Sequence, residues 1–330
     1  MARTVSIVLT TYNGERFLPA QLASYLAQTR LPDELVVGDD GSSDNTLALL
    51  EDFARRAPFP VRITVNAVNL GPTRNFVEAV LRSTGDVIFL SDQDDIWHEG
   101  KIERMMQHMT DHPHCWLATH DAALVDGDGQ PLGLTMGGQI DSVPGGIAAR
   151  DLVAGCCMAI DARLARLYDP LPRLAQHDAW LAAAAERLGL RAYLPEALID
   201  YRRHGGNVSA SFMSDARPAS RWARFRDRAG KAMATPVGVA LSAAAASRED
   251  LVAALVHHTA VLTQVVAPDR LEAEISIQRA ALEREKQRIA VHHGPRLARP
   301  AKLLAALLGG TYREKGGAMS LLRDLGGLLR

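Results

Sequence analysis

Three carboxylates lie within four residues of this chain, at Asp92, Asp94 and Asp95. Like charges held this close repel one another, so the arrangement is costly unless a cation or a set of hydrogen-bond donors neutralises it. Magnesium prefers oxygen ligands and often binds one or two carboxylates together with the phosphates of a substrate. The spacing therefore indicates a site for a divalent cation and a phosphate-bearing ligand, and a solvated acidic turn is the alternative that these residues alone leave open.

Apolar segments lead into these acids and into other polar residues. Residues 87–90 are Val, Ile, Phe and Leu, which is typical of a buried strand, and the acids follow closely. Residues 5–9 and 35–37 are two more largely apolar runs, and they lead to Thr10 and Asp39. Strands that alternate with helices indicate a parallel sheet with helices on both faces. The polar residues would then meet at the carboxyl edge of the sheet, where open α/β sheets bind ligands.

Charge is divided unevenly along the 330 residues, although the composition of 47% hydrophobic and 23% charged residues is ordinary for a globular protein. Residues 1–216 carry 18 Lys and Arg against 28 Asp and Glu, a net charge of −10. Residues 217–330 carry 19 against 10, a net charge of +9. We therefore expect an acidic domain over residues 1–216 and a basic helical region over residues 217–330.

Apolar residues at helical spacing predict helices in the basic region, at residues 237–267, 271–289, 301–308 and 318–329. The charges of Arg248 to Asp250 interrupt the first of these helices, which argues against a membrane span. The region suits attachment to an anionic membrane surface. The alternative is a helical subdomain that packs on the acidic domain or on a second subunit of a homo-oligomer. No nucleic-acid motif accompanies the basic residues, so we expect no nucleic acid partner.

The cysteines and the N-terminus bear on the cellular compartment. Cys115, Cys156 and Cys157 lack the spacing of zinc ligands, and the two adjacent cysteines are poorly placed to pair with each other, which predicts a reducing compartment. The chain has no signal-peptide pattern and no run of about 18 apolar residues. We therefore expect a cytoplasmic protein.

Three polar segments in this order, residues 10–13, 39–44 and 92–95, resemble the nucleotide-sugar-binding half of family 2 glycosyltransferases. The resemblance covers about residues 4–210. It implies a GT-A fold, an α/β architecture with a Rossmann-like nucleotide-sugar-binding sheet and flanking helices, followed here by a C-terminal α-helical region. No glycine-rich dinucleotide motif follows the first apolar run, so an NAD-type phosphate cradle is unsupported.

The resemblance also implies roles in donor binding. Thr10, Tyr12 and Glu15 match the group that packs around the base and ribose of the donor. Asp39 matches the carboxylate that accepts the imino hydrogen of the base, which thymine and uracil share. Taken singly, Tyr12 would be ordinary packing and Asp39 a turn or helix cap.

Metal binding and catalysis are assigned by the same resemblance. Asp92 and Asp94 match the pair that binds Mg²⁺ or Mn²⁺, with Asp94 as the direct ligand and Asp92 closer to the ribose. Asp178 stands where the family places its catalytic base, which takes the proton of the acceptor hydroxyl in an inverting transfer. His177 is the alternative catalytic base in this segment, because imidazole titrates near neutral pH and could also accept a proton. Residues 155–158 match a small-residue stretch that borders the acceptor site, and close helix packing is the alternative there.

Residues 201–209 narrow the resemblance to bacterial rhamnosyltransferases, together with Trp97 after the acids and the His177–Asp178 pair. This likeness implies that His204 binds the metal or the donor diphosphate. Arg202, with the neighbouring Arg203, would offset the charge of the leaving group. An exposed basic turn is the alternative for this segment.

These features predict an inverting glycosyltransferase that moves L-rhamnose from dTDP-rhamnose to a cell-surface polysaccharide or a lipid-linked glycan, at the inner face of the cytoplasmic membrane. Another UDP-sugar or dTDP-sugar donor is the nearest alternative. A non-catalytic assembly partner that binds a nucleotide sugar is an alternative from a different class. A nucleotidyltransferase would need a glycine-rich loop with a basic residue, which residues 10–15 do not supply.

Overall fold

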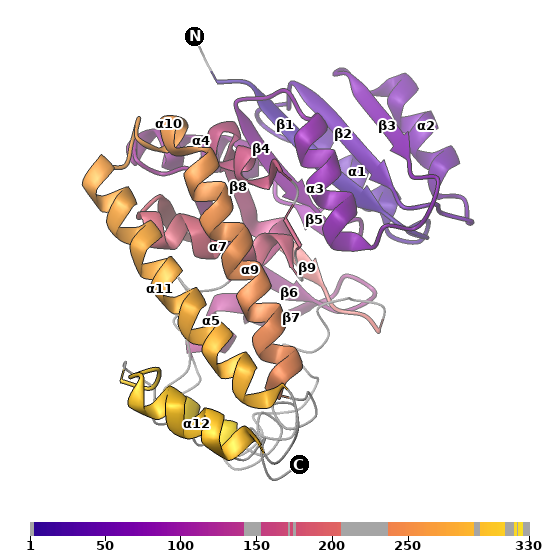
Figure 1. Cartoon of the computed structure of the whole chain (residues 1–330). Coiled ribbons are helices and arrows are strands. Elements are labelled where there is room, and N and C mark those ends of the chain that lie inside the picture. The colour runs from indigo at the N-terminus through magenta and orange to yellow at the C-terminus, as the bar shows by residue number, and fades with distance from the viewer. Residues whose placement is uncertain are drawn as a thin grey trace. The chain divides into compact units, whose positions relative to one another are not determined.

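The computed structural model describes residues 3–141, 153–170, 172–173, 176–205, 237–293, 298–313, 320–321 and 323–325. The chain forms two compact units, Met1–Phe212 and Met213–Arg330, whose elements are labelled in Figure 1.

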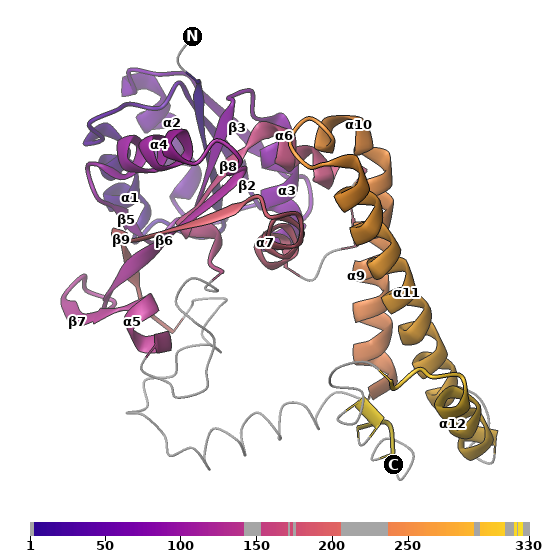
Figure 2. The same cartoon turned by 90° about the vertical axis from the view of Figure 1, so that its left-hand side faces the viewer.

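The N-terminal unit begins with strands and helices in alternation. Four neighbouring strands run parallel in the order β3-β2-β1-β4. These strands are β1 (Val5–Thr11), β2 (Glu34–Asp39), β3 (Val61–Val65) and β4 (Val87–Ser91), and the helices between them are α1 (Leu18–Leu26), α2 (Thr46–Arg56) and α3 (Pro72–Arg82). In Figure 2, α1 and α2 lie on one face of the sheet and α3 lies on the other. The predicted α/β alternation is confirmed.

Burial follows the position of each strand in the sheet. The strands β1, β2 and β4 are buried along their whole length, because the sheet is covered on both faces there. The edge strand β3 is partly exposed. The continuous apolar runs in the sequence therefore correspond to the strands at the centre of the sheet.

The rest of the sheet is mixed, which corrects the expectation of a parallel sheet. Strand β8 runs antiparallel to both β4 and β6, whereas β6 and β9 are parallel. Antiparallel neighbours need no helical crossover, and the turn at residues 126–130 joins β6 to β7 as a hairpin. The strands are β5 (Ile96–Trp97), β6 (Leu117–Val125), β7 (Pro131–Thr135), β8 (Met158–Asp161) and β9 (Arg191–Arg202). The helices are α4 (Lys101–Asp111), α5 (Met136–Asp141), α6 (Ala162–Ala165), α7 (His177–Leu188) and the short 3₁₀ segments η2 (Gly155–Cys157) and η3 (Arg166–Tyr168).

The C-terminal unit is helical where it is described. Its helices are α9 (Val237–His257), α10 (Thr259–Leu262), α11 (Pro268–His292) and α12 (Arg299–Leu308). Helix α9 runs through the charged residues Arg248 to Asp250, and Arg248 pairs with Glu285 of α11 at 2.9 Å. The first predicted helix is shorter than expected, since α9 ends at His257. Most of the predicted helix at residues 318–329 lies outside the described residues.

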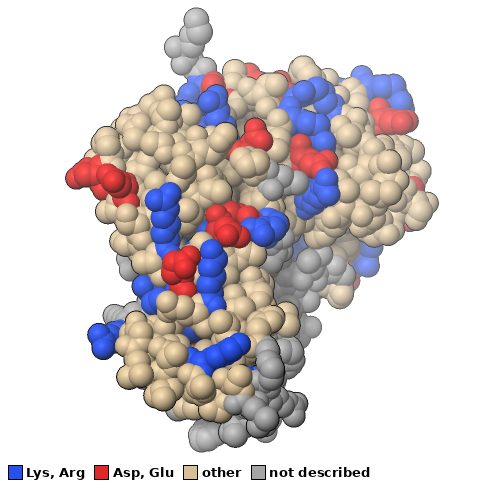
Figure 3. All heavy atoms as spheres, viewed as in Figure 1, with Lys and Arg blue, Asp and Glu red and all other residues tan. Residues whose placement is uncertain are grey.

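One face of α12 is buried and the other is open. Leu303 and Ala306 pack with Val291 of α11 in a small core. No Asp or Glu occurs from residue 298 to residue 313, and the surface over α12 in Figure 3 shows uncharged atoms with Lys and Arg. Within the described part of the chain, no helix has the length and apolar character needed to cross a membrane.

Candidate active site

The polar loops after β1, β2 and β4 leave the sheet from one edge. The strand register places Thr11 beside Asp39 and Leu9 beside Ser91, so the three parallel strands end close together. This is the carboxyl edge at which open α/β sheets bind ligands. The structure thus brings together the three polar segments that were predicted to form the binding site, residues 10–13, 39–44 and 92–95.

Hydrogen bonds between side chains and backbone join the first two loops. Asn13, in the left-handed region at φ 48°, accepts a hydrogen bond from the backbone N of Ser43 at 2.8 Å and donates its own backbone N–H to Ser42 Oγ at 2.9 Å. Glu15 accepts a hydrogen bond from the backbone N of Asn45 at 2.9 Å, at the start of α2. Glu15 therefore has a structural partner here, and its role near the donor ribose stays a prediction.

Asp39 is fully buried and holds the turn that follows β2. Its Oδ1 accepts hydrogen bonds from the backbone N of Gly41 and Ser42, at 3.1 and 2.8 Å. Its Oδ2 accepts from the hydroxyls of Thr11 and Ser42, at 2.7 and 2.6 Å. A direct hydrogen bond from Asp39 to the donor base stays a prediction, and it would require the release of at least one of these donors.

Two members of the predicted donor-binding group are exposed, Tyr12, with 51% of its surface accessible, and Glu15, whereas Thr10 is buried. Gln93, which the sequence analysis did not single out, holds the backbone of Tyr12. Its Oε1 accepts from Tyr12 N at 2.9 Å and its Nε2 donates to Tyr12 O at 3.1 Å. The acidic loop and the first loop are therefore bound together beside the exposed ring.

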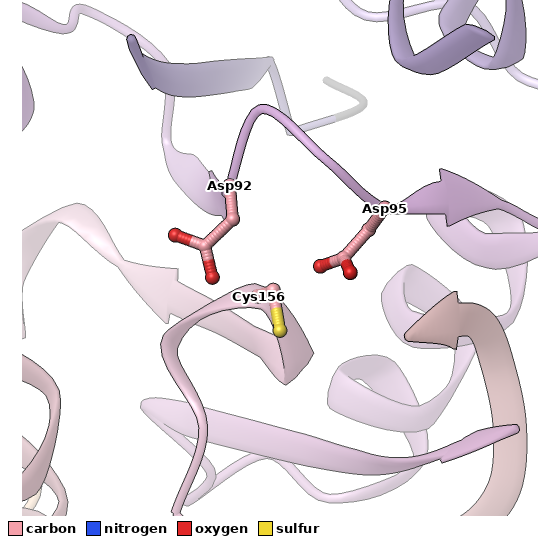
Figure 4. A group of neighbouring side chains, drawn as sticks. All are labelled: Asp92, Asp95 and Cys156. Carbon is pink, nitrogen blue, oxygen red and sulfur yellow. The ribbon is translucent and has the colours of Figure 1, made fainter. Parts of the chain in front are cut away.

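The acids after β4 divide into two groups. Carboxylate oxygens of Asp92 and Asp95 and the sulfur of Cys156 all lie within 4.8 Å of one another, as Figure 4 shows. Asp94 lies outside this cluster, and its Oδ2 is 2.7 Å from Nε2 of His204. The predicted ligands Asp94 and His204 thus meet each other, while Asp92 meets two residues that were not predicted as ligands.

The two buried carboxyl groups of this cluster, Asp92 and Asp95, favour the binding of a cation. Burial, followed by the charges of Asp94 and Asp178, raises the pKa of Asp92 to about 7. Burial is also the main cause that raises the pKa of Asp95 well above its ordinary value. No N–H or O–H donor among the described residues reaches Oδ2 of Asp95. A cation bound here would satisfy that oxygen and stabilise the charged form of both carboxylates.

Lys101 is fully buried next to the cluster, at the start of α4. Its Nζ donates to the backbone oxygen of Cys156 at 2.6 Å and lies 3.8 Å from the centroid of the Trp97 ring. Burial lowers the pKa of Lys101 to about 8, and the nearby acids act in the opposite direction. The sequence analysis had not assigned this buried cation to the site, because a lysine at the start of a predicted helix is ordinarily exposed.

Asp178 and His177 occupy different environments at the start of α7. Oδ2 of Asp178 accepts a hydrogen bond from the backbone N of Gly155 at 3.1 Å. The ring of His177 is buried and stacks on Phe76 with centroids 4.5 Å apart, and burial lowers its pKa to about 4. Packing of this kind favours a structural role for His177. Asp178, whose charge reaches Asp92, is the better placed of the two for proton transfer.

The end of β9 and the residues after it contact the acids, because β9 pairs with β5, which begins directly after Asp95. The backbone N of Arg202 donates to Oδ1 of Asp95 at 3.2 Å, and its Nε donates to the backbone oxygen of Asp94 at 3.0 Å. The His204 ring stacks on Phe17 with centroids 4.6 Å apart. Residues 206–209 of the predicted rhamnosyltransferase segment lie outside the described residues.

Comparison with known sequences decides the family of this site. Residues 6–156 match the family model described as Glycosyl transferase family 2, and this stretch contains all three polar loops and Cys156. These residues form a glycosyl transferase family 2 domain. Asp178 and His204 lie beyond the matched residues of the glycosyltransferase model, so their roles stay predictions.

Individual proteins resemble this glycosyltransferase over different lengths. An uncharacterised protein of Mycobacterium tuberculosis is 26% identical over 254 residues, which are 74% of this chain and 70% of that protein. The dTDP-rhamnosyl transferase of Shigella flexneri is 35% identical over 99 residues, which are 29% of this chain and 34% of that protein. The chain thus spans about a third of this named relative.

A solved structure shares the fold of the glycosyltransferase. The TarS protein of S. aureus, crystallised with UDP, has a TM-score of 0.53 and 14% sequence identity, with 86% of this chain and 91% of that chain covered. At this identity the likeness concerns the fold alone. The predicted fold class, a GT-A α/β sheet with flanking helices and a C-terminal helical region, is confirmed.

Proposed function

We propose that this chain is an inverting glycosyltransferase that moves a sugar from a nucleoside-diphosphate donor to a hydroxyl group of an acceptor. The convergence of Asp92 and Asp95 at the end of β4, with the charge of Asp178 close by, is the observation that carries the proposal. Membership of glycosyl transferase family 2 supports the reaction class. The loops after β1 and β2 supply a binding edge for the nucleotide.

A divalent ion, Mg²⁺ or Mn²⁺, fits the donor set at this edge. Asp92 and Asp95 offer carboxylate oxygens, one of them buried without an N–H or O–H donor among the described residues. Asp94 and His204 would stand beside the ion and hold each other in place. When bound, the ion would neutralise part of the charge of the donor diphosphate.

Asp178 would act as the general base of the transfer. Its carboxylate would take the proton of the acceptor hydroxyl while the hydroxyl oxygen attacks the anomeric carbon from the side opposite the diphosphate. The hydrogen bond from Gly155 N fixes the orientation of this carboxylate. Arg202, whose guanidinium group lies next to Asp94, would offset the negative charge that develops on the leaving group.

We propose dTDP-rhamnose as the donor, with another dTDP-sugar or a UDP-sugar as the alternative. The similarity to a dTDP-rhamnosyl transferase over 99 residues supports this choice. The acceptor would be a growing cell-surface polysaccharide or a lipid-linked glycan. A non-catalytic role as a nucleotide-sugar-binding assembly partner would leave the same loops in place without turnover.

We expect a thermal-shift screen with Mn²⁺ to rank dTDP-rhamnose above dTDP-glucose, UDP-glucose and UDP-N-acetylglucosamine. At a hundred times its dissociation constant a ligand adds about 2.7 kcal/mol of stability, which raises the midpoint on the order of 5 °C. Release of dTDP on incubation with Mn²⁺ and an acceptor extract would distinguish an enzyme from an assembly partner. Stabilisation by a UDP-sugar alone would overturn the choice of rhamnose, and the absence of any nucleotide effect would overturn the proposed function.

We also propose that the C-terminal unit attaches to the inner face of the cytoplasmic membrane through α12. Leu304 and Leu308 are 57% and 75% exposed, and Leu307, on the same helix, is also exposed. Arg299 and Lys302 flank this apolar face, within a region whose net charge is +9. A helix with an apolar face and basic flanks suits the surface of an anionic bilayer.

Replacing both Leu304 and Leu308 with Ser in the full chain should reduce binding to phosphatidylglycerol vesicles at least tenfold, because each buried leucine contributes about 1.5–3 kcal/mol. Co-sedimentation at low and high salt measures the effect, and the residual binding of the variant should be the more sensitive to salt. Leu134→Ser is the matched control, because Leu134 is 50% exposed in the N-terminal unit. Equal sedimentation of the double variant and the control would show that α12 is a structural element and not an anchor.

A further inference from the structure

Cys156 places a sulfur atom among the carboxylates of the metal site. Its Sγ and one oxygen each of Asp92 and Asp95 lie within 4.8 Å of one another. Figure 4 shows both carboxylates pointing toward Cys156, the acids from the loop between β4 and β5 and the cysteine from η2. The sequence resemblance had placed Cys156 only in a small-residue stretch near the acceptor.

The position of this sulfur is set by buried contacts. Strand β8 pairs antiparallel with β4, with Ala159 opposite Phe89, so the residues before β8 lie beside the residues after β4. Lys101 Nζ holds the backbone oxygen of Cys156 at 2.6 Å, and the Cys156 side chain is buried. The thiol therefore faces the acids in a fixed backbone frame.

Asp95 supplies an independent sign that this group is built for a ligand. The residue is 1% exposed, and its Oδ1 accepts a hydrogen bond from the backbone N of Arg202. Its Oδ2 has no N–H or O–H donor among the described residues, so the thiol of Cys156, a weak donor, is the hydrogen-bonding group beside this carboxylate. Figure 4 shows the carboxylate directed toward the cluster. A buried carboxylate oxygen without such a donor is costly, and a bound cation would remove the cost.

We propose that Cys156 is a sulfur ligand at this metal site and gives it a preference for thiophilic divalent ions, Cd²⁺ and Zn²⁺, over Mg²⁺ and Mn²⁺. This inference rests on the proposed function, because it concerns the ion that serves the donor. Thiolates select soft ions, whereas carboxylates alone suit Mg²⁺ and Mn²⁺. Two ligand atoms on one tetrahedral zinc ion lie about 3.3–3.7 Å apart, so metal binding would draw these atoms, which lie within 4.8 Å of one another, about 1 Å closer together. On binding, the S–H proton leaves to solvent as the sulfur–metal bond forms.

The test is a Cd²⁺ titration of the full chain with its cysteines reduced, followed by the ultraviolet sulfur-to-cadmium charge-transfer band. We expect one equivalent of Cd²⁺ to saturate the band in the wild type and in Cys115→Ser, and the band to be absent in Cys156→Ser. Cys115 is the matched control, because it is a buried free cysteine outside the cluster. Cys156→Ala serves as a second variant, and far-ultraviolet circular dichroism checks that each variant is folded.

Manganese binding, measured by the loss of the free Mn²⁺ electron-spin-resonance signal, separates this inference from the proposed function. In Cys156→Ser the affinity for Cd²⁺ should fall at least about tenfold while that for Mn²⁺ changes less than about threefold. The Cd²⁺ band could be missing from the wild type, or it could survive in Cys156→Ser. Either result, with Mn²⁺ binding that still depends on Asp92, would refute Cys156 as a ligand and leave the proposed function standing. Failure of both ions to bind the wild type would overturn the metal-dependent function as well.

Discussion

The Asp178→Asn variant is expected to transfer sugar about 10²–10⁴ times more slowly than the wild type while it binds the donor with unchanged affinity. Asparagine keeps the shape of the side chain but cannot take a proton from the acceptor hydroxyl. The donor loops after β1, β2 and β4 do not include this residue, so nucleotide binding should persist. Steady-state transfer rates and donor affinity by calorimetry, measured with the same preparation, give the two quantities.

Glu186→Gln is the control for this change, because Glu186 is an exposed carboxylate on the same helix, α7. It should leave the transfer rate unchanged. Near-normal turnover of Asp178→Asn would contradict the assignment of Asp178 as the general base, and another residue would then have to take the proton of the acceptor hydroxyl. His177 would be a poor one, since its buried ring has a pKa lowered to about 4 and packs on Phe76.

The Asp92→Asn variant should lose at least about a hundredfold in affinity for Mn²⁺, with a parallel loss of transfer, because it removes a charged ligand from the ion. Asp95→Asn should have a similar effect. Asp94→Asn should have a smaller one, because Asp94 is paired with His204 and lies outside the cluster. The Mn²⁺ electron-spin-resonance titration measures all three, and Asp128→Asn, at an exposed acid, is the control. A larger loss in Asp94→Asn than in the other two variants would restore Asp94 as the direct ligand.

The pH dependence of Mn²⁺ binding provides a second check on Asp92. Its pKa is raised to about 7 by burial first, so the carboxyl holds a proton at lower pH and that proton competes with the ion. Wild-type affinity should therefore fall at least about tenfold for each pH unit below 7, because Asp95, whose pKa is also raised, can hold a competing proton as well. The Asp92→Asn variant should show a weaker dependence on pH. An unchanged pH profile in this variant would show that another group carries the competing proton.

Local patterns in the sequence predicted the first half of the fold well. Apolar runs such as residues 87–90 report the buried centre of a sheet directly, because each run is set by the burial of its own strand. The antiparallel strand β8 was not predicted, since its four residues carry no signal for direction. That direction depends on which strand it pairs with, which only the folded chain determines.

The same limit applies to the candidate site. Asp92 could be predicted as a site residue from the sequence, because it directly follows an apolar strand and matches a family motif. Its cluster partner Cys156 lies 64 residues further along the chain. No spacing rule links two residues that meet through antiparallel pairing of their strands. The burial of His177 under Phe76 was likewise invisible, since a histidine before an aspartate looks the same in sequence whether it is exposed or packed.

The hydrogen bonds between the loops after β1 and β2 have a consequence for attempts to change the donor. Asn13 and Glu15 in the first loop are bound to Ser43 and Asn45 in the second, so neither loop has an independent conformation. A graft of one loop from a glycosyltransferase with a different donor would leave unmatched partners in the other. Donor exchange by protein engineering should therefore transplant residues 10–15 and 39–46 as a single cassette, with Gln93 included because it anchors the backbone of Tyr12.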